Sequence, residues 1–229
     1  MNTVEYLKKK EQSAAKMATQ GHRTICQSCL RPIKACFCEH LIPFQTDSKI
    51  CILMHPLEAK RSQIGTGRLT HLGISNSELI IDINFDHNKR FNELLANDDY
   101  LPVVLYPGKD AINIDCMQTV SDAHKLSLSS KKLLIFIIDG TWPCAKTMMK
   151  KTTKLHRITK VCFEAKFTSL FEIKHQPAKF CLSTIESVHY LLQCLESLGV
   201  ENLSPLERDS LIQAFKAMVE FHKDCANDP

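Results

Sequence analysis

The fold is decided by residues 133–142, which read LLIFIIDGTW. The six residues from Leu133 to Ile138 are all apolar, and a short run that is apolar on both faces is typical of a central strand in a parallel sheet. Asp139 ends this run, and a helix is predicted to start near Trp142, with Pro143 at a first-turn position that tolerates proline. Open α/β sheets bind their ligands outside the carboxyl ends of the strands. The sequence therefore predicts that Asp139 lies at the ligand-binding edge of a sheet.

Strand-like and helix-like segments alternate along the rest of the chain. Short apolar runs predict further strands at residues 50–55, 79–83 and 102–106. Helical candidates lie between them at residues 58–72 and 87–96. This alternation predicts an α/β fold with a mostly parallel sheet and flanking helices.

Two helices near the end of the sequence have clear start signals. Ser183-Thr184-Ile185-Glu186 is typical of a capping box, and Gly199 is the expected end of the helix that follows it. Ser204-Pro205-Leu206-Glu207 predicts the start of a last helix, which should reach about Cys225.

Composition places the chain among globular proteins. Of its 229 residues, 44% are hydrophobic and 24% are charged, which excludes a disordered chain. The longest wholly apolar run has six residues, too short to cross a bilayer, and the first residues do not read as a secretory signal. We expect a cytoplasmic protein with no membrane partner, and no obligate protein partner is evident. The net charge of +4 is only weak support for an anionic partner.

Four of the eleven cysteines, Cys26, Cys29, Cys36 and Cys38, lie within a short segment rich in turn-forming residues. Such clustering favours a structural zinc site with four thiolate ligands. A disulfide pair or four unrelated thiols are the alternatives, and His22 or His40 could replace one thiolate. We divide the chain into a leader (1–22), this cysteine knuckle (23–45) and an α/β domain (46–229).

The tetrapeptide Asp139-Gly140-Thr141-Trp142 joins the central strand to the next helix. Thr141 can cap that helix, and Trp142, the only tryptophan, offers a flat surface to a base or a cofactor ring. Taken alone, these residues are more typical of a helix cap and a core tryptophan than of an active site.

Several spaced motifs in the same order change that interpretation. They are the four-cysteine segment 26–38, His55-Pro56-Leu57-Glu58, Gly65-Thr66-Gly67-Arg68-Leu69, Leu105-Tyr106-Pro107-Gly108, Asp139-Gly140-Thr141-Trp142 and Ser183-Thr184-Ile185-Glu186. With them the chain resembles, over residues 23–200, the DTW-domain family of tRNA-uridine aminocarboxypropyltransferases. The resemblance implies transfer of the 3-amino-3-carboxypropyl group of S-adenosylmethionine to N3 of a tRNA uridine, with release of methylthioadenosine. It also implies a SPOUT-like fold with a knot, which no sequence pattern could indicate.

Under this resemblance we assign the catalytic positions to Asp139, Thr141 and Trp142. Asp139 is the candidate base, because uridine N3 must lose its proton to react. Trp142 could stack on the target base. The predicted cofactor-binding positions are Leu105, Tyr106, Pro107, Gly108, Asp139, Gly140, Ser183, Thr184 and Glu186. A capping box alone would also account for Ser183 and Glu186.

A run of cations without an acid follows the tetrapeptide between Lys146 and Lys160. Its position suggests contacts to tRNA phosphates, although most such runs are merely solvated faces. The predicted tRNA-binding positions are His55, Glu58, Thr66, Gly67, Arg68, Lys146, Lys150, Lys151, Lys154 and Arg157. His55 and Glu58 could instead cap the first helix. The alternatives for the whole chain are a SPOUT-like RNA methyltransferase and a zinc-stabilised RNA-binding module without catalysis.

Overall fold

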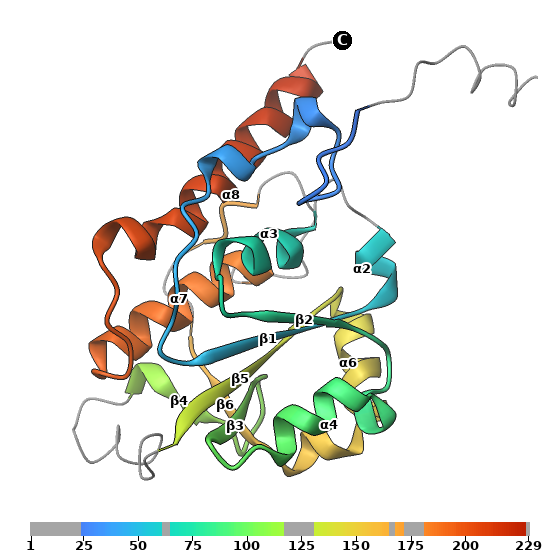
Figure 1. Ribbon diagram of the computed structural model, residues 1–229, viewed down its shortest axis with the longest axis vertical. Coiled ribbons are helices and arrows are strands. Elements are labelled where there is room, and N and C mark those ends of the chain that lie inside the picture. The colour runs from blue at the N-terminus through green and yellow to red at the C-terminus, as the bar shows by residue number, and fades with distance from the viewer. Residues whose placement is uncertain (1–23, 61–64, 117–130, 165–167, 172–180, 228–229) are drawn as a thin grey trace, which may run out of the picture.

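The computed structural model of the chain describes residues 24–60, 65–116, 131–164, 168–171 and 181–227. Within these ranges, six strands form one sheet in which every pair is parallel, in the order β2-β1-β5-β3-β6-β4 (Figure 1). The predicted α/β fold with a parallel sheet is thus confirmed. The strands are β1 (Lys49–Met54), β2 (Glu78–Ile81), β3 (Tyr100–Leu105), β4 (Ile112–Asn113), β5 (Lys132–Asp139) and β6 (Thr159–Cys162).

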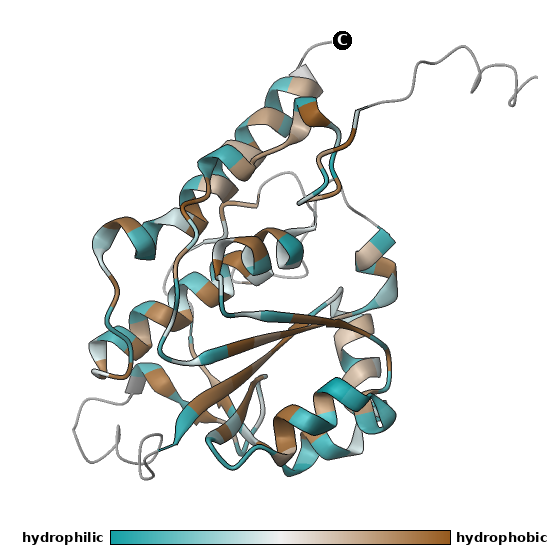
Figure 2. Ribbon diagram, viewed as in Figure 1, coloured by the Kyte–Doolittle hydropathy of each residue, from teal (hydrophilic) through white to brown (hydrophobic). Residues whose placement is uncertain are grey.

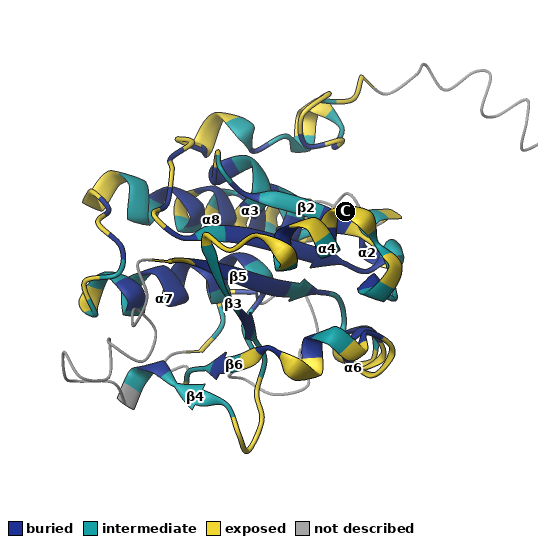
Figure 3. Cartoon of the chain, turned by 60° about the horizontal axis from the view of Figure 1, so that its bottom comes forward, coloured by how far each residue is buried: buried dark blue, intermediate teal, exposed yellow. Residues whose placement is uncertain are grey.

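Helices cover both faces of the sheet. Buried side chains of α3, α7 and α8 join one hydrophobic cluster, and those of α4 and α6 join a second cluster on the opposite face. Figure 3 shows β5 as a buried strand, drawn in dark blue. The helices are α2 (Pro56–Lys60), α3 (Thr66–Gly73), α4 (Lys89–Ala96), α6 (Trp142–Lys151), α7 (Thr184–Ser197) and α8 (Pro205–Asn227), with short 3-10 turns at Ile33–Ala35, Cys38–His40, Phe85–His87, Ile114–Cys116 and Thr153–Arg157.

The central strand β5 is apolar because both of its faces are covered. Leu133, Ile135 and Ile137 enter the cluster under α7, whereas Leu134 and Phe136 enter the cluster under α4 and α6. The strands are correspondingly the most hydrophobic ribbons in Figure 2. β5 pairs with β1 and β3, so its carboxyl end lies in the middle of the sheet edge.

Two predictions about individual elements were wrong. The helix expected at residues 58–72 is divided, because Gly65 is extended and caps a separate helix, α3. The strands β4 and β6 were not predicted, because β4 is only two residues long and β6 is a four-residue strand that starts within the end of the cation run, at Thr159 and Lys160.

The cysteine knuckle packs on the end of α8 rather than standing apart. Phe37 and Leu41 belong to the same buried cluster as α7 and α8, and the Phe37 ring meets Phe221 edge-on with ring centroids 5.6 Å apart. Figure 1 shows this blue segment beside the red helix. The predicted leader at 1–22 lies outside the described residues.

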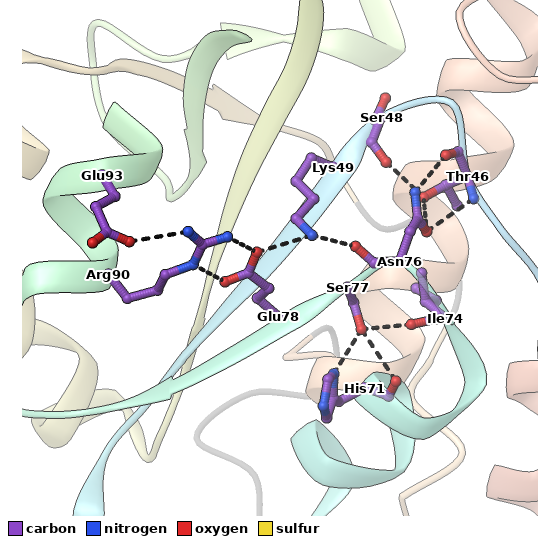
Figure 4. Close-up of polar contacts among 10 residues, drawn as sticks. All are labelled: Thr46, Ser48, Lys49, His71, Ile74, Asn76, Ser77, Glu78, Arg90 and Glu93. Atoms are coloured by element: carbon purple, nitrogen blue, oxygen red, sulfur yellow. Dashed lines mark hydrogen bonds and ion pairs between the residues drawn. The ribbon is translucent and has the colours of Figure 1, made fainter. Parts of the chain in front are cut away.

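The outer strand β2 is tied to its neighbours by charged side chains (Figure 4). Glu78 accepts two hydrogen bonds of 2.6 Å from Arg90, and Lys49 Nζ lies 3.0 Å from the same carboxylate. These hydrogen bonds, led by those from Arg90, lower the pKa of Glu78 to about 2. In the described part of the chain, no helix is long and apolar enough to cross a membrane.

Candidate active site

Asp139 is the last residue of β5, and its side chain is held in a buried position. The residue is only 5% exposed, and Thr184 at the start of α7 donates a hydrogen bond of 2.5 Å from Oγ1 to its Oδ1. The backbone carbonyl of Asp139 accepts a 2.9 Å bond from the N–H of His55. Hydrogen bonds from α7 and from the residue after β1 therefore hold Asp139 in place at the end of β5.

Gly67 lies directly against the Asp139 carboxylate. A Cβ atom at position 67 would sit 2.4 Å from Asp139 Oδ2, so only glycine fits there without movement of the carboxylate. The segment Gly65–Arg68 is the cap and first turn of α3, in which Thr66 and Gly67 are buried. The close contact explains this glycine as a packing requirement of Asp139.

A pocket of about 620 Å³ opens beside Asp139 at the carboxyl edge of the sheet. Its wall contains six of the residues that the sequence assigned to the active site, and these come from three separate motifs. They are Leu105, Tyr106, Pro107, Gly140, Trp142 and Thr184. Motifs that lie far apart in the chain are thus brought together by the parallel sheet.

Aromatic residues shape one side of this pocket. Trp142 is 38% exposed, so it is not a core residue, and its ring meets Tyr106 edge-on with centroids 6.5 Å apart. Burial raises the pKa of Tyr106 above its usual value, so its hydroxyl stays protonated at neutral pH. The exposed indole offers the flat surface that a nucleobase can stack on.

The N-termini of two helices reach the pocket. Gly140 and Trp142 belong to the start of α6, whereas Thr184 and Ser187 belong to the first turn of α7. The partial positive charge of a helix N-terminus favours an anionic group such as a carboxylate. Thr141 occupies the cap position of α6, but its side chain makes no capping hydrogen bond, which corrects that expectation.

Sequence reasoning missed the part of the wall that follows β6. Cys162, Phe163 and Glu164 line the pocket, as do Cys181 and Leu182 just before α7. The backbone N–H of Glu164 donates a 2.8 Å bond to Asp115. Nothing in this segment resembles a motif, and only the topology reveals its place, since β6 is inserted beside β3.

Four of the predicted cofactor-binding positions lie outside the pocket wall. Glu186 is fully buried and accepts hydrogen bonds from the backbone and hydroxyl of Ser183, from Ser169 and from the N–H of Leu170. It therefore closes the capping box and fastens a loop, which accounts for Ser183 and Glu186 without a cofactor. Gly108 is exposed beyond the pocket. Asp139 lies behind Thr184.

His55 and Glu58 are buried at the start of α2. The Nδ1 atom of His55 accepts a 3.2 Å bond from the N–H of Leu57, so the imidazole caps this short helix. Glu58 is 7% exposed. Both residues are close to the catalytic edge but offer little surface to an RNA. Arg68, on α3, is half-buried.

The cation run is divided among three elements. α6 ends at Lys151, so Lys146, Lys150 and Lys151 are exposed on this helix. Arg157 is exposed on the following 3-10 turn. Lys154 is instead half-buried and donates to the carbonyl of Asp86 and to the side chain of Asn92. Lys154 does not continue the row of lysines on α6, because the helix ends before it.

The four knuckle thiols form a compact cluster. All four sulfurs lie within 4.8 Å of one another, and the pairs Cys26–Cys38 and Cys29–Cys36 are 4.0 and 3.7 Å apart. Sulfurs about 2.3 Å from a tetrahedral zinc lie roughly 3.8 Å apart, whereas a disulfide needs about 2.05 Å. Hydrogen bonds from the backbone of Cys29 and Ser28 lower the pKa of Cys26 to about 6. The cluster can therefore hold a zinc ion.

The pattern of similarity to other proteins agrees with this geometry. The chain is 29% identical to tRNA-uridine aminocarboxypropyltransferase 2 of Drosophila melanogaster, over 89% of this chain and 77% of the relative. It is 29% identical to the mouse protein of that name, over 76% of this chain and 57% of the relative, and 27% identical to tRNA-uridine aminocarboxypropyltransferase A of Arabidopsis thaliana, over 87% and 81%. No solved structure is significantly similar to it. The DTW domain matches residues 23–223, which contain both the cysteine knuckle and the pocket, and the chain therefore belongs to the DTW domain family.

Proposed function

We propose that the protein is a tRNA-uridine aminocarboxypropyltransferase that uses S-adenosylmethionine. The observation that carries this proposal is one pocket at the carboxyl edge of the sheet that is lined by Trp142 and by Thr184, whose hydroxyl donates to the buried Asp139. The relatives from fly, mouse and Arabidopsis carry that name and match most of this chain. The reaction joins the 3-amino-3-carboxypropyl group to N3 of a tRNA uridine, with methylthioadenosine as the by-product.

The pocket suits S-adenosylmethionine in size and chemistry. Its volume of about 620 Å³ lies in the usual range for small-molecule sites, and most of its wall is apolar. Leu105, Tyr106 and Pro107 would hold the adenosine, and the first turn of α7 would attract the carboxylate. Glu164, the only acid among the described residues of the wall, would attract the ammonium group. When bound, the sulfonium supplies an activated carbon to the uridine.

Asp139 and Thr184 would handle the uridine proton. Thr184 lines the pocket and donates its hydroxyl proton to Asp139, so its oxygen can accept a hydrogen bond from the pocket side. The N3 proton would move to the Asp139 carboxylate through this hydroxyl, as N3 bonds to carbon and methylthioadenosine leaves. Trp142 would stack on the base, which must leave any helical stack to enter the pocket.

The exposed cations of α6 would hold the tRNA backbone. Lys146, Lys150 and Lys151 lie on the helix whose first residue is Trp142, so phosphates bound there would present a nucleotide to the pocket. We also propose a structural zinc in the knuckle, a SPOUT-like knotted path of the chain, and a cytoplasmic location. The division at 23–45 and 46–229 stays part of this proposal.

Identification of the by-product tests the proposal. The purified protein is incubated with tRNA and S-adenosylmethionine, and the nucleosides released are separated by chromatography. Methylthioadenosine supports the proposal. Adenosylhomocysteine would instead establish a methyltransferase, and tRNA binding without any by-product would establish a non-catalytic module.

A pair of variants tests the roles of Asp139 and Thr184. Thr184→Val removes the hydroxyl at constant shape and should lower kcat by about a hundredfold. Thr184→Ser keeps the hydroxyl and should retain most of the turnover. Equal rates for the two variants would remove Thr184 from the proton path.

A further inference from the structure

Arg31 is a fully buried cation in the middle of the cysteine knuckle. It is 1% exposed, and it lies in the sequence between Cys29 and Cys36. Its Nη2 donates a 2.8 Å hydrogen bond to the carbonyl of Gly65, and its guanidinium lies 5.4 Å from the centre of the Phe37 ring. Burial of a guanidinium is costly unless several groups compensate it, so these contacts call for an explanation.

The backbone of Arg31 belongs to the cysteine segment, because its carbonyl accepts a 2.8 Å hydrogen bond from the N–H of Cys26. Arg31 interacts electrostatically with Cys29, Cys36 and Cys38. Four thiolates around one zinc ion carry a formal charge of −2, and arginine keeps its positive charge even when buried. Arg31 thus offsets part of the charge that a metal-loaded cluster would bury.

The guanidinium of Arg31 contacts the residue that caps α3, the helix that faces Asp139. Gly65 caps α3, and two residues later Gly67 touches the Asp139 carboxylate with no side chain between them. Contacts therefore run from Cys26 to Arg31, from Arg31 to Gly65 at the start of α3, and from Gly67 in the first turn of α3 to Asp139. A shift of α3 would be passed straight to that carboxylate, and misplacement of a catalytic group by about 1 Å can cost a hundredfold in rate.

We propose that Arg31 is a positioning residue that transmits the metal-bound shape of the knuckle to Asp139 through the first turn of α3. The proposal rests on the proposed function for its catalytic consequence only. Zinc in the knuckle would then do more than stabilise the fold, because its presence would set the position of the catalytic carboxylate.

Hydrogen exchange measured by mass spectrometry tests the link without any assay of activity. Removal of zinc from the wild-type protein with a chelator should speed exchange in α3 by about tenfold and leave α4 unchanged. In Arg31→Met the exchange of α3 should already be fast and should not respond to the chelator. Wild-type α3 that ignores zinc removal, or Arg31→Met α3 that still responds to it, would overturn the proposal.

Measurements of zinc release and of kcat then distinguish the effect of Arg31 on the cysteine cluster from its effect on α3. Arg31→Lys keeps the charge but lacks the fork that reaches Gly65, so zinc release to a chromogenic chelator should stay near the wild-type rate while kcat falls by about tenfold. Arg31→Met should release zinc faster than the wild-type protein and should also have a lower kcat. The control Arg208→Met removes a half-buried arginine that pairs with Glu196 elsewhere, and it should change neither. Wild-type kcat in folded, zinc-loaded Arg31→Met would contradict the proposal. Failure of the proposed function would appear separately, as absence of methylthioadenosine from the wild-type reaction.

Discussion

The cysteine knuckle and the catalytic pocket are built in opposite ways. The knuckle takes its four thiols from residues 26–38, so a short stretch of chain suffices to bring them together. The pocket takes its wall from β3, β5, β6, α6 and α7, and it exists only when the whole sheet has formed. Changes in the knuckle should therefore appear first in metal binding and stability, whereas changes in the pocket should appear in turnover.

The largest effect is expected at Asp139. Asp139→Asn keeps the shape and removes the charge, so kcat should fall by at least about a hundredfold while the melting temperature changes little. Steady-state kinetics and thermal unfolding measure the two quantities. Asp99→Asn, at an exposed position before β3, is the matched control and should be neutral. Turnover of Asp139→Asn at the wild-type rate would contradict the assignment.

Changes in the knuckle should instead affect metal binding and stability. Cys29 is buried among the four thiols, and Cys29→Ser should lower the zinc content below one ion per chain and reduce the free energy of unfolding by roughly 3 kcal/mol or more. Elemental analysis and chemical denaturation provide the measurements. Cys225→Ser changes an exposed cysteine of α8 and should alter neither. If both variants hold equal zinc, the cluster is not the metal site.

Trp142 should show an intermediate effect. Trp142→Ala removes the surface proposed to stack on the base, and the apparent affinity for tRNA should fall by about tenfold, since a stacked base contributes about 1–3 kcal/mol. Trp142→Phe retains a ring and should recover most of the affinity. Binding curves for the two variants that coincide would argue against stacking.

A smaller effect is expected on the cationic helix. Changing Lys146, Lys150 and Lys151 together to Gln should weaken tRNA binding at low salt and reduce the slope of log affinity against log salt by about one unit for each lost phosphate contact. The same change at the exposed residues Lys34, Lys89 and Lys216 removes equal charge elsewhere. Equal slopes for the two triple variants would show that only net charge matters.

The smallest effect concerns Glu78, which is remote from both sites. Its pKa is about 2 in the folded protein, below the usual value of 4.5, so its ion pairs stabilise the fold above about pH 4.5. That contribution is lost as the pH falls from there toward 2. Glu78→Gln should flatten this part of the stability curve, measured by urea denaturation at a series of pH values. An unchanged acid limb would mean that Arg90 and Lys49 contribute little at this surface.

The same contrast explains what the sequence could predict. The run of six apolar residues identified β5, and the capping box identified the start of α7, because both signals are local. Likewise the spacing of the cysteines identified their cluster. Local patterns also placed Asp139, Trp142 and Tyr106 at the ends of their strands and helices.

The parts of the fold and of the site that were not predicted depend on contacts between segments far apart in the sequence. Nothing in the sequence shows that β6 is inserted next to β3, so the pocket residues Phe163 and Glu164 could not be predicted. The packing of Gly67 against the Asp139 carboxylate could not be predicted, because it joins residues 67 and 139. The contacts of Lys154 with Asp86 and Asn92 could not be predicted either, because these partners come from another part of the chain.

The central claim is that the pocket beside Asp139 transfers an aminocarboxypropyl group to tRNA. Its most direct test is mass spectrometry of the nucleosides from tRNA treated with S-adenosylmethionine and either the wild-type protein or Asp139→Asn. We predict a uridine that gains one aminocarboxypropyl group with the wild-type protein and an unmodified uridine with the variant. A methylated nucleoside, or tRNA left unmodified by the wild-type protein, would contradict the account.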